Sequence, residues 1–421
     1  MIKMKNSGIE WIGEVPEHWE ILRHKNIMKK KKDICLSYKG EDILSLTMNG
    51  VIKRDLENPS GKMPTTFDGY QIVEEGNLLL CLFDIDVTPR CVGLIQNNGL
   101  TSPAYSQFIL TDGDYAPYYN YLLMMIDNNK SFLHLSKNLR SSLTEDDFGA
   151  IKTIKPTLAE QKKIAQFLDK KLSQIDKLLK LEEEEIKILK DYKTALITHF
   201  VVKGNNKYNL NETGIGLIGE IPEHWELKKL KYCCSIVRGG SPRPIEEYIS
   251  NNDEGYHWIK IGDTEKDSKY INGTKEKIIE KGLSKTRLVH KNDLILTNSM
   301  SYGEPYILNI DGCIHDGWVA FSNYKGVVKE FLYYFLSSSC CKEQFKTQVA
   351  GGVVQNLNID KIGNTYIVLP DIETQKNIIK ELEEKMDKVN VLLNQKLKKV
   401  EELHKFKQTI LFEYVTGKKE I

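Results

Sequence analysis

An internal repeat divides this chain into two similar halves. The segment GIEWIGEVPEHWE, residues 8–20, returns 206 residues later as GIGLIGEIPEHWE, residues 214–226. A second pair, KPTLAEQKKIAQFL at 155–168 and LPDIETQKNIIKEL at 369–382, is 214 residues apart. Self-similarity on this scale indicates one structural unit built twice. Each half therefore reads as an entry motif, a mixed segment and a helical segment, with the second mixed segment eight residues longer.

The helical segments carry the clearest periodicity. After Pro156, apolar residues follow alternating spacings of three and four, which is the seam of a coiled coil. The first series is Leu168, Leu172, Ile175, Leu179, Ile186, Leu189 and Leu196, and the second is Leu382, Met386, Val389, Leu393, Val400, Leu403 and Ile410. We predict two paired helices, each of about 40 residues and roughly 60 Å. The alternative is one amphipathic helix packing on each globular domain.

Charged residues interrupt both series at the same layer. Glu182 lies midway between Leu168 and Leu196, and Lys396 lies midway between Leu382 and Ile410. We hypothesise that Glu182 and Lys396 pair within about one layer. Antiparallel and equal-register parallel alignments both bring them together, so the charges favour pairing of the helices without fixing its direction. In the alternative interpretation, both side chains extend independently to solvent.

The mixed segments combine strand-like runs, turns and a following helix. Strand candidates are residues 77–85, 91–95 and 106–110 in the first segment, and 256–262, 293–299, 305–310 and 318–322 in the second. Both segments then become helical, at 118–127 and 329–338. Each half is therefore predicted to be an α+β domain followed by a long helix. The predicted boundaries are 1–155 and 226–369 for the domains, 156–203 and 370–417 for the helices, and 204–225 for the linker with the repeated entry motif.

Composition and missing motifs exclude several function classes. Lys and Arg total 59 and Asp and Glu 58, so any site for a polyanion must be local. The eight cysteines form no CxxC pair and suit a reduced chain, so no metal site is expected. No phosphate-binding loop, zinc helix or nucleophile elbow occurs, and no catalytic residues are predicted. No apolar run has the length of a membrane span and no secretory signal is evident, which favours the cytoplasm and no membrane partner.

Several motifs together resemble the specificity subunits of type I restriction-modification systems. They are the duplicated entry motif, GLTSPAYSQF at 99–108, LRSSLTEDDF at 139–148 and KPTLAEQKKIAQFLDKKLSQID at 155–176. The resemblance covers nearly the whole chain. It implies an α+β fold in which two target recognition domains alternate with two long helices that form an antiparallel coiled coil about a pseudo-twofold axis. Each domain would read one half of a split DNA site, and the coiled coil would set the unread spacer.

The resemblance also implies partners and cofactors. The partners are double-stranded DNA, two modification subunits that bind S-adenosylmethionine, and ATP-dependent restriction subunits. S-adenosylmethionine, ATP and magnesium are expected on those partner subunits and no cofactor on this chain. One departure from the family pattern concerns the helix starts, where Thr374-Gln375 replaces the Glu160-Gln161 pair of the first copy. It puts in doubt whether the two helical surfaces are equivalent docking sites.

Candidate DNA-binding residues follow from base-recognition chemistry. Arginine reads guanine edges in a bidentate manner, and Asn or Gln reads adenine. Arg90, the Asn138 to Ser142 segment and the arginines flanking Gly239-Gly240-Ser241-Pro242 belong to apparent loops. The predicted set is Arg54, Arg90, Asn138, Arg140, Ser141, Arg238, Ser241, Arg243, Arg287, Gln355 and Asn356, with Lys30 and Lys31 as phosphate contacts. Each arginine has the alternative of an ordinary surface residue, and the lysine run that of a solvated charge cluster.

The predicted function is that of a non-catalytic DNA-specificity subunit. Alternatives are a specificity subunit of a methylation-only system and a coiled-coil interaction scaffold without a nucleic-acid role. Residues 20–155 carry 16 basic and 17 acidic side chains, and residues 226–369 carry 19 and 17. Because neither domain is broadly cationic, the chain alone should bind DNA weakly, with much of the phosphate contact supplied by the modification subunits.

Overall fold

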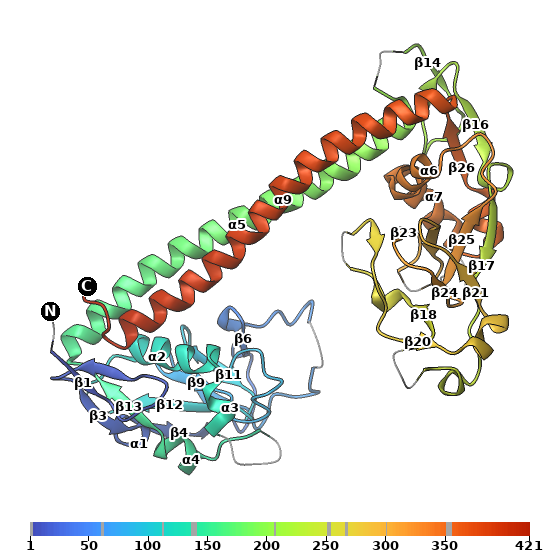
Figure 1. Ribbon diagram of the computed structural model, residues 1–421. Helices are drawn as coiled ribbons and strands as arrows, with labels where there is room; N and C mark the ends of the chain where they lie inside the picture. Colours follow the sequence, from blue (N-terminus) through green and yellow to red (C-terminus); the bar gives the residue numbers. More distant parts are fainter. Residues whose placement is uncertain are drawn as a thin grey trace. The chain divides into compact units, whose positions relative to one another are not determined.

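The computed structural model describes residues 3–59, 63–111, 113–135, 141–205, 208–250, 254–265, 268–299, 301–350 and 356–421. These residues form two compact units. Unit 1 comprises the residues up to 183 together with 398–421, and unit 2 comprises 184–397. The long helices α5 (Leu158–Lys203) and α9 (Ile372–Val415) each contribute one portion to either unit. Figure 1 shows α5 in green and α9 in red, running side by side.

Two antiparallel sheets form the centre of unit 1. One has the strand order β10-β9-β12-β4 and the other the order β11-β8-β5. Their strands are β4 (Met28–Lys31), β5 (Asp33–Ile34), β8 (Gln71–Val73), β9 (Leu78–Leu80), β10 (Val92–Leu94), β11 (Gly99–Thr101) and β12 (Ser106–Leu110). Helix α2 (Ala116–Asn128) packs on β10 and joins a core that includes Leu168 and Leu172 of α5.

Smaller elements complete unit 1. They are the hairpin of β1 (Met4–Asn6) and β2 (Glu14–Pro16), the pair of β3 (Glu20–Arg23) with β13 (Lys152–Lys155), the hairpin of β6 (Leu44–Thr47) and β7 (Gly50–Lys53), and helices α1 (His24–Ile27), α3 (Ser131–Leu135) and α4 (Glu145–Ala150). The entry motif supplies the turn and second strand of the first hairpin and places Trp19 in the core.

Unit 2 also has two central sheets, each with one more strand than its counterpart and each with one parallel pair, β19 with β23 and β18 with β24. Their orders are β17-β25-β22-β23-β19 and β20-β18-β24-β21. The strands are β17 (Ser235–Arg238), β18 (Tyr256–Ile259), β19 (Tyr270–Ile271), β20 (Lys277–Ile278), β21 (Arg287–Val289), β22 (Leu294–Thr297), β23 (Pro305–Leu308), β24 (Gly312–Ile314) and β25 (Trp318–Ser322). The order β17-β25-β22-β23 matches β4-β12-β9-β10 of unit 1 in sequence position, so the repeat extends to the topology of the sheets.

The remaining elements of unit 2 are smaller, and several of them have counterparts in unit 1. They are the hairpin of β14 (Leu210–Glu212) and β15 (Glu220–Pro222), the pair of β16 (Glu226–Lys229) with β26 (Tyr366–Leu369), helices α6 (Lys329–Ser337), α7 (Ser339–Val349) and α8 (Ile359–Asn364), and the short 3-10 helices η1 (Leu230–Tyr232), η2 (Ile245–Glu247), η3 (Ile261–Asp263) and η4 (Glu280–Lys285). Every strand candidate of the sequence contains a strand of the structure, and the α+β class is confirmed.

The two long helices pack together in antiparallel fashion within each unit. In unit 1, Lys407 pairs with Asp176 and Lys399 with Glu182, so the partner number falls as the α5 number rises. In unit 2, Lys396 pairs with Glu185 and the Lys193 ammonium donates to Asn390. The predicted seam residues are buried or half-buried along both helices. The coiled coil inferred from the apolar spacing is therefore confirmed, and the structure supplies its direction.

The charged residues of the seam, Glu182 and Lys396, each form an ion pair with a residue of the opposite helix. Glu182 is only 5% exposed, so it does not extend to solvent. Its Oε1 lies 2.6 Å from Lys399 Nζ in unit 1, and Lys396 contacts Glu185 in unit 2. A buried carboxylate requires a partner of this kind because desolvation of a charge is costly. The direct pairing of Glu182, a residue of unit 1, with Lys396, a residue of unit 2, stays a prediction.

Candidate nucleic-acid interface

In unit 1, the loop between β9 and β10 lies against the predicted Ser141. The Ile85 amide donates to the Ser141 carbonyl at 3.1 Å, and the Asp84 amide donates to Ser142 Oγ at 3.4 Å. Asp84 and Ser141 both adopt left-handed φ values, 46° and 47°. Non-glycine residues in this region are uncommon and concentrate at functional sites. The predicted Asn138 and Arg140 lie outside the described residues.

Two aromatic rings accompany this loop. The ring centroids of Phe83 and Tyr105 lie 6.4 Å apart with an interplanar angle of 30°, and Phe83 is 37% exposed. Burial raises the pKa of Tyr105, and the positive charge of Arg54 opposes this shift. Aromatic faces beside a cation are stacking surfaces for nucleic-acid bases. Sequence reasoning concentrated on arginines and missed both rings.

Arg90 lies in a different setting from the one its loop position suggested. It lines a groove of about 850 Å³ in unit 1, walled by the β6–β7 hairpin, α2 and the unit 1 portions of both long helices. Asp169 and Asp176 of α5 and Lys407 of α9 share this groove. Arg90 Nε is buried and has no hydrogen-bond partner among the residues that the structure describes. Its role in base reading stays a prediction.

The predicted phosphate contacts take part in ion pairs within unit 1. Lys30 Nζ lies 3.4 Å from Glu145, and Lys31 pairs with both Glu74 and Asp33. The hydrogen bond to Glu74 is the main reason that the pKa of Lys31 is raised. To bind phosphate, these lysines would have to give up their ion pairs with protein carboxylates. Each would therefore contribute less free energy to DNA binding than a lysine without an ion pair.

In unit 2, one turn gathers several predicted residues. Asp316, in the turn between β24 and β25, accepts a hydrogen bond from Ser241 Oγ through its Oδ1 at 2.7 Å. Its carbonyl oxygen accepts from Arg238 Nε at 2.8 Å and from Asn298 Nδ2 at 3.2 Å. The guanidinium of Arg238 also lies 3.8 Å from the Asp316 carboxylate. Asp316 was not predicted, because nothing in the local sequence links it to a loop 75 residues earlier.

The glycine pair before Ser241 allows the chain to pass close to neighbouring backbone. A Cβ on Gly239 would lie 2.2 Å from the His315 carbonyl oxygen, and one on Gly240 would lie 2.6 Å from the Lys285 carbonyl oxygen. The Gly239 amide donates to the Trp318 carbonyl at 2.9 Å. This close approach fixes the path of residues 238–241 across the ends of β24 and β25.

Arg243 follows this fixed segment and is exposed. It makes no hydrogen bond or ion pair with any residue that the structure describes. A shallow pocket of about 610 Å³ adjoins it, lined by residues 241–246 with Trp258, Lys260, His315 and Asp316. Of the three residues predicted in this loop, Arg243 alone presents an uncommitted side chain.

The ionisable groups beside this pocket have altered affinities for protons. Burial lowers the pKa of His315 more than the adjacent Asp316 raises it, so the imidazole is neutral at pH 7. The hydrogen bond from Ser241 is the main cause of the lowered pKa of Asp316. The site at neutral pH therefore combines a cationic Arg243, a neutral imidazole and a carboxylate already engaged by Ser241 and Arg238.

The other predicted residues of unit 2 are dispersed. Arg287 is exposed on β21, which is an edge strand of its sheet. Asn356 is exposed before α8, and its carbonyl lies 3.5 Å from Lys361 Nζ. Gln355 lies outside the described residues. Within the described ranges there is no group of three or more His, Cys, Asp or Glu residues that could hold a metal ion. No helix in these ranges is both long enough and apolar enough to cross a membrane.

The starts of α5 and α9 contact the segments that precede α2 and α6 through a shared glutamine. Gln161 Nε2 donates to the Pro156 carbonyl at 3.0 Å, and Gln375 Nε2 donates to the Pro370 carbonyl at 2.8 Å. Both side-chain oxygens accept from a backbone amide that precedes a domain helix. The repeat therefore keeps this contact in both units.

The residue before the glutamine behaves differently in the two units. Glu160 accepts from Thr157 and also from Trp19 Nε1 at 3.1 Å, with His18 Nε2 at 2.8 Å. Burial alone would raise the pKa of Glu160, but these hydrogen bonds outweigh it and lower the pKa to about 2. In unit 2 the cap is reversed, because Thr374 donates to Asp371.

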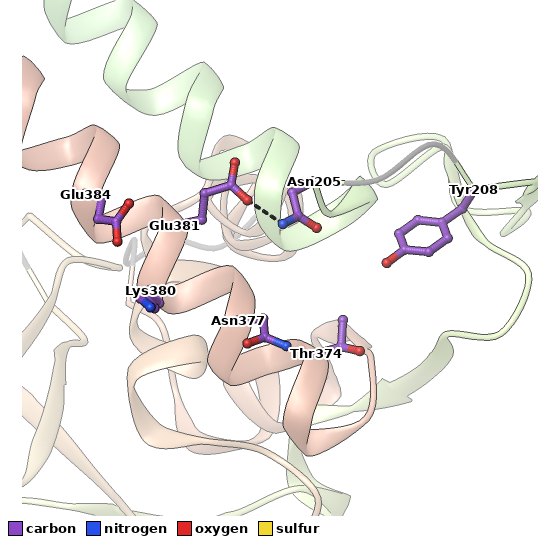
Figure 2. A pocket seen from close by; sticks show the side chains of 7 residues that line it. All are labelled: Asn205, Tyr208, Thr374, Asn377, Lys380, Glu381 and Glu384. Carbon is purple, nitrogen blue, oxygen red and sulfur yellow. Dashed lines mark hydrogen bonds between the residues drawn. The ribbon is translucent and has the colours of Figure 1, made fainter.

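A polar pocket marks the start of α9. Figure 2 shows its lining of Asn205, Tyr208, Thr374, Asn377, Lys380, Glu381 and Glu384, with Asn205 hydrogen-bonded to Glu381.

Trp225 is buried in the core of unit 2, and its Nε1 lacks a hydrogen-bond partner among the described residues. The acceptor that Glu160 gives to Trp19 thus has no counterpart for Trp225.

Moving the first cap into unit 2 should therefore stabilise that unit. The double substitution Asp371→Thr with Thr374→Glu should add about 1 kcal/mol to its free energy of unfolding, since a buried indole N–H gains an acceptor. Thr374→Glu alone should gain less, because the new carboxylate stands one turn from Asp371. Urea unfolding followed by tryptophan fluorescence measures the free energy of unfolding of both variants. Glu160→Thr is the corresponding variant of unit 1, in which Trp19 loses its acceptor. A double variant no more stable than the wild type would contradict the explanation.

Known proteins are similar to this chain over different shares of its length. Residues 222–402 match the family model described as the type I restriction modification DNA specificity domain. The putative type I restriction enzyme MjaX specificity subunit of Methanocaldococcus jannaschii is 26% identical, over 97% of this chain and 95% of that protein. The type I restriction enzyme EcoBI specificity subunit of Escherichia coli is 26% identical, over 54% of this chain and 50% of that protein.

A solved structure shares the fold. One chain of a type I R-M system, studied for complex assembly and conformational transition, aligns with a TM-score of 0.72. The alignment covers 96% of this chain and 99% of that chain at 14% sequence identity. The duplicated α+β units and the two long helices thus occur together in a known structure.

Proposed function

Because this chain belongs to the specificity subunits of type I restriction-modification systems, we propose that it reads a bipartite DNA sequence and directs its partner subunits to that site. The observation that carries the proposal is the duplication of one α+β plan, with matching strand orders around the central sheet of each unit. Two similar readers suit a site made of two half-sites, one for each unit. The long helices, each of which contributes to both units, are proposed to set the length of the unread spacer.

In the proposed complex, the partner subunits carry out the catalytic reactions. Two modification subunits would bind S-adenosylmethionine and methylate the DNA, and restriction subunits would use ATP and magnesium for cleavage. This chain would be non-catalytic and act in the cytoplasm. The nearly balanced charge of both halves supports DNA binding shared with the partner subunits, because neither half has a large excess of cations to neutralise phosphates.

Within each unit, the loops at one end of the central sheet are the proposed readers. In unit 1 these are the β9–β10 loop with Ser141, accompanied by Phe83, Tyr105 and Arg54. In unit 2 the reader is the loop that ends on Arg243. Loops held by a rigid scaffold are the usual carriers of recognition residues.

Exchanging one reader tests the proposal. Replacement of residues 226–369 by the corresponding domain of another specificity subunit should change one half-site and leave the other half-site unchanged. Mapping methylated bases genome-wide in cells that carry the complete system measures both half-sites and the spacer together. The wild-type chain and the reciprocal exchange of residues 20–155 are the controls. A continuous target sequence, or a simultaneous change of both half-sites, would refute the two-reader assignment.

A further inference from the structure

We infer that Asp316 is a positioning residue that holds the Arg238–Ser241 segment and so aims Arg243 at a guanine in the half-site of unit 2. This inference rests on the proposed function of the chain. It assigns two different roles to three residues that the sequence predicts alike as DNA contacts. Arg238 and Ser241 would secure the loop, and Arg243 would contact the base.

The contacts of Asp316 support a securing role. Its carboxylate accepts from Ser241 Oγ at 2.7 Å and lies 3.8 Å from the Arg238 guanidinium. Its carbonyl accepts from Arg238 Nε at 2.8 Å and from Asn298 Nδ2 at 3.2 Å. One residue therefore joins the end of β17, the following loop and the residue after β22.

The backbone adds rigidity to this arrangement. The Gly239 amide donates to the Trp318 carbonyl at 2.9 Å, and the Gly240 amide donates to the Ile314 carbonyl at 3.2 Å. Pro242 is buried immediately before the exposed Arg243. A reader that is fixed before binding loses less conformational entropy on contact with DNA, so its geometry discriminates better between bases.

The charges are arranged to favour an anionic ligand. An uncompensated carboxylate next to Arg243 would repel phosphates and compete with the base for the guanidinium. Ser241 and Arg238 engage the Asp316 carboxylate, while Arg243 makes no ion pair with the described residues. Its planar donor fork remains available for the two acceptors, O6 and N7, that guanine presents in the major groove.

A double-mutant cycle on the complete complex tests the inference. The complex, assembled with its modification subunits and S-adenosylmethionine, methylates duplexes in which each base pair of both half-sites is substituted in turn. Arg243→Ala should reduce discrimination at one guanine of one half-site by roughly 10-fold or more. Asp316→Ala should reduce discrimination at the same base pair, and it should add almost nothing when combined with Arg243→Ala. Asp316→Asn, which keeps the acceptor for Ser241, should restore part of the loss.

The control is Asp311→Ala, an exposed acid of the same unit that pairs with His290 instead. It should leave discrimination at both half-sites unchanged. Equal losses at both half-sites, or a full additional loss on top of Arg243→Ala, would overturn the role of Asp316. If the wild-type complex methylated no bipartite site at all, the proposed function itself would fail, and this result is distinct from the others. If Asp316→Ala fails to assemble, Ser241→Ala removes the same hydrogen bond and must then relax the same base pair.

Discussion

Unit 1 is expected to lose about 3 kcal/mol of unfolding free energy through one histidine as the pH falls from 7 to 4. His24 is completely buried, and its ring lies 4.5 Å from that of Phe148. Burial lowers the pKa of His24 from 6.5 to about 4, and the backbone of Phe148 only partly opposes this shift. The folded state therefore favours the neutral ring. Above pH 6.5 both states are neutral and the contribution is complete; between 6.5 and 4 the unfolded state gains protons first and stability falls.

Comparing a variant with the wild type isolates this effect from other titrating groups. His24→Phe keeps an aromatic ring in the site and removes the titration, so its stability relative to wild type should rise as the pH falls from 7.5 to 4.5. Urea unfolding, monitored by the unit 1 tryptophans Trp11 and Trp19, gives the free energy at each pH. His134→Gln changes an exposed histidine and should show a constant difference from wild type. A constant difference for His24→Phe as well would contradict the assignment.

Gly239→Ala is expected to disable the reader of unit 2. The added Cβ would lie 2.2 Å from the His315 carbonyl oxygen and 2.6 Å from that of Ile314, far inside van der Waals contact. Both obstacles are backbone atoms, and the hydrogen bond from the Gly239 amide to Trp318 prevents the loop from moving away. We expect a cost of about 3 kcal/mol in the stability of unit 2, at the upper end for overpacked sites. Recognition of one half-site should weaken with it.

Two measurements separate these consequences. Unfolding monitored by the unit 2 tryptophans, Trp225, Trp258 and Trp318, reports stability, and methylation of substituted duplexes reports recognition. Gly273→Ala is the matched control, because a Cβ there meets no atom within 4 Å. It should leave both measurements close to wild type. A Gly239→Ala chain with wild-type stability and unaltered half-sites would show that the loop follows another path.

The long helices were predictable because their signal is local. Alternating spacings of three and four identify a seam from the sequence alone, and every predicted seam residue is at least half-buried. The direction of pairing was not available from the charges, since Glu182 and Lys396 sit at equivalent layers in both alignments. The antiparallel direction is shown by ion pairs such as that of Asp176 with Lys407, which depend on the three-dimensional register of the helices.

The candidate site was predictable only as a set of loops. Arg238 and Arg243 flank the same Gly-Gly-Ser-Pro run and are equivalent by any rule of composition. What distinguishes them is Asp316, which is 75 residues from Ser241 and contacts Arg238 but not Arg243 in the described structure. Arg90 likewise lies in a groove with α5, a contact that its turn-forming neighbour Pro89 does not indicate. Tertiary contacts of this kind leave no periodic trace in a sequence.

The division of the chain between its units also determines the order in which they can fold during synthesis. Unit 2 is one continuous stretch, residues 184–397, whereas unit 1 needs residues 398–421 to complete its core. Leu411 and Val415 are buried in that core, and the Tyr118 hydroxyl donates to the Val415 carbonyl at 3.0 Å. Since a ribosome releases the chain from its N-terminus, the domain that is translated first is the last to acquire all of its packing partners.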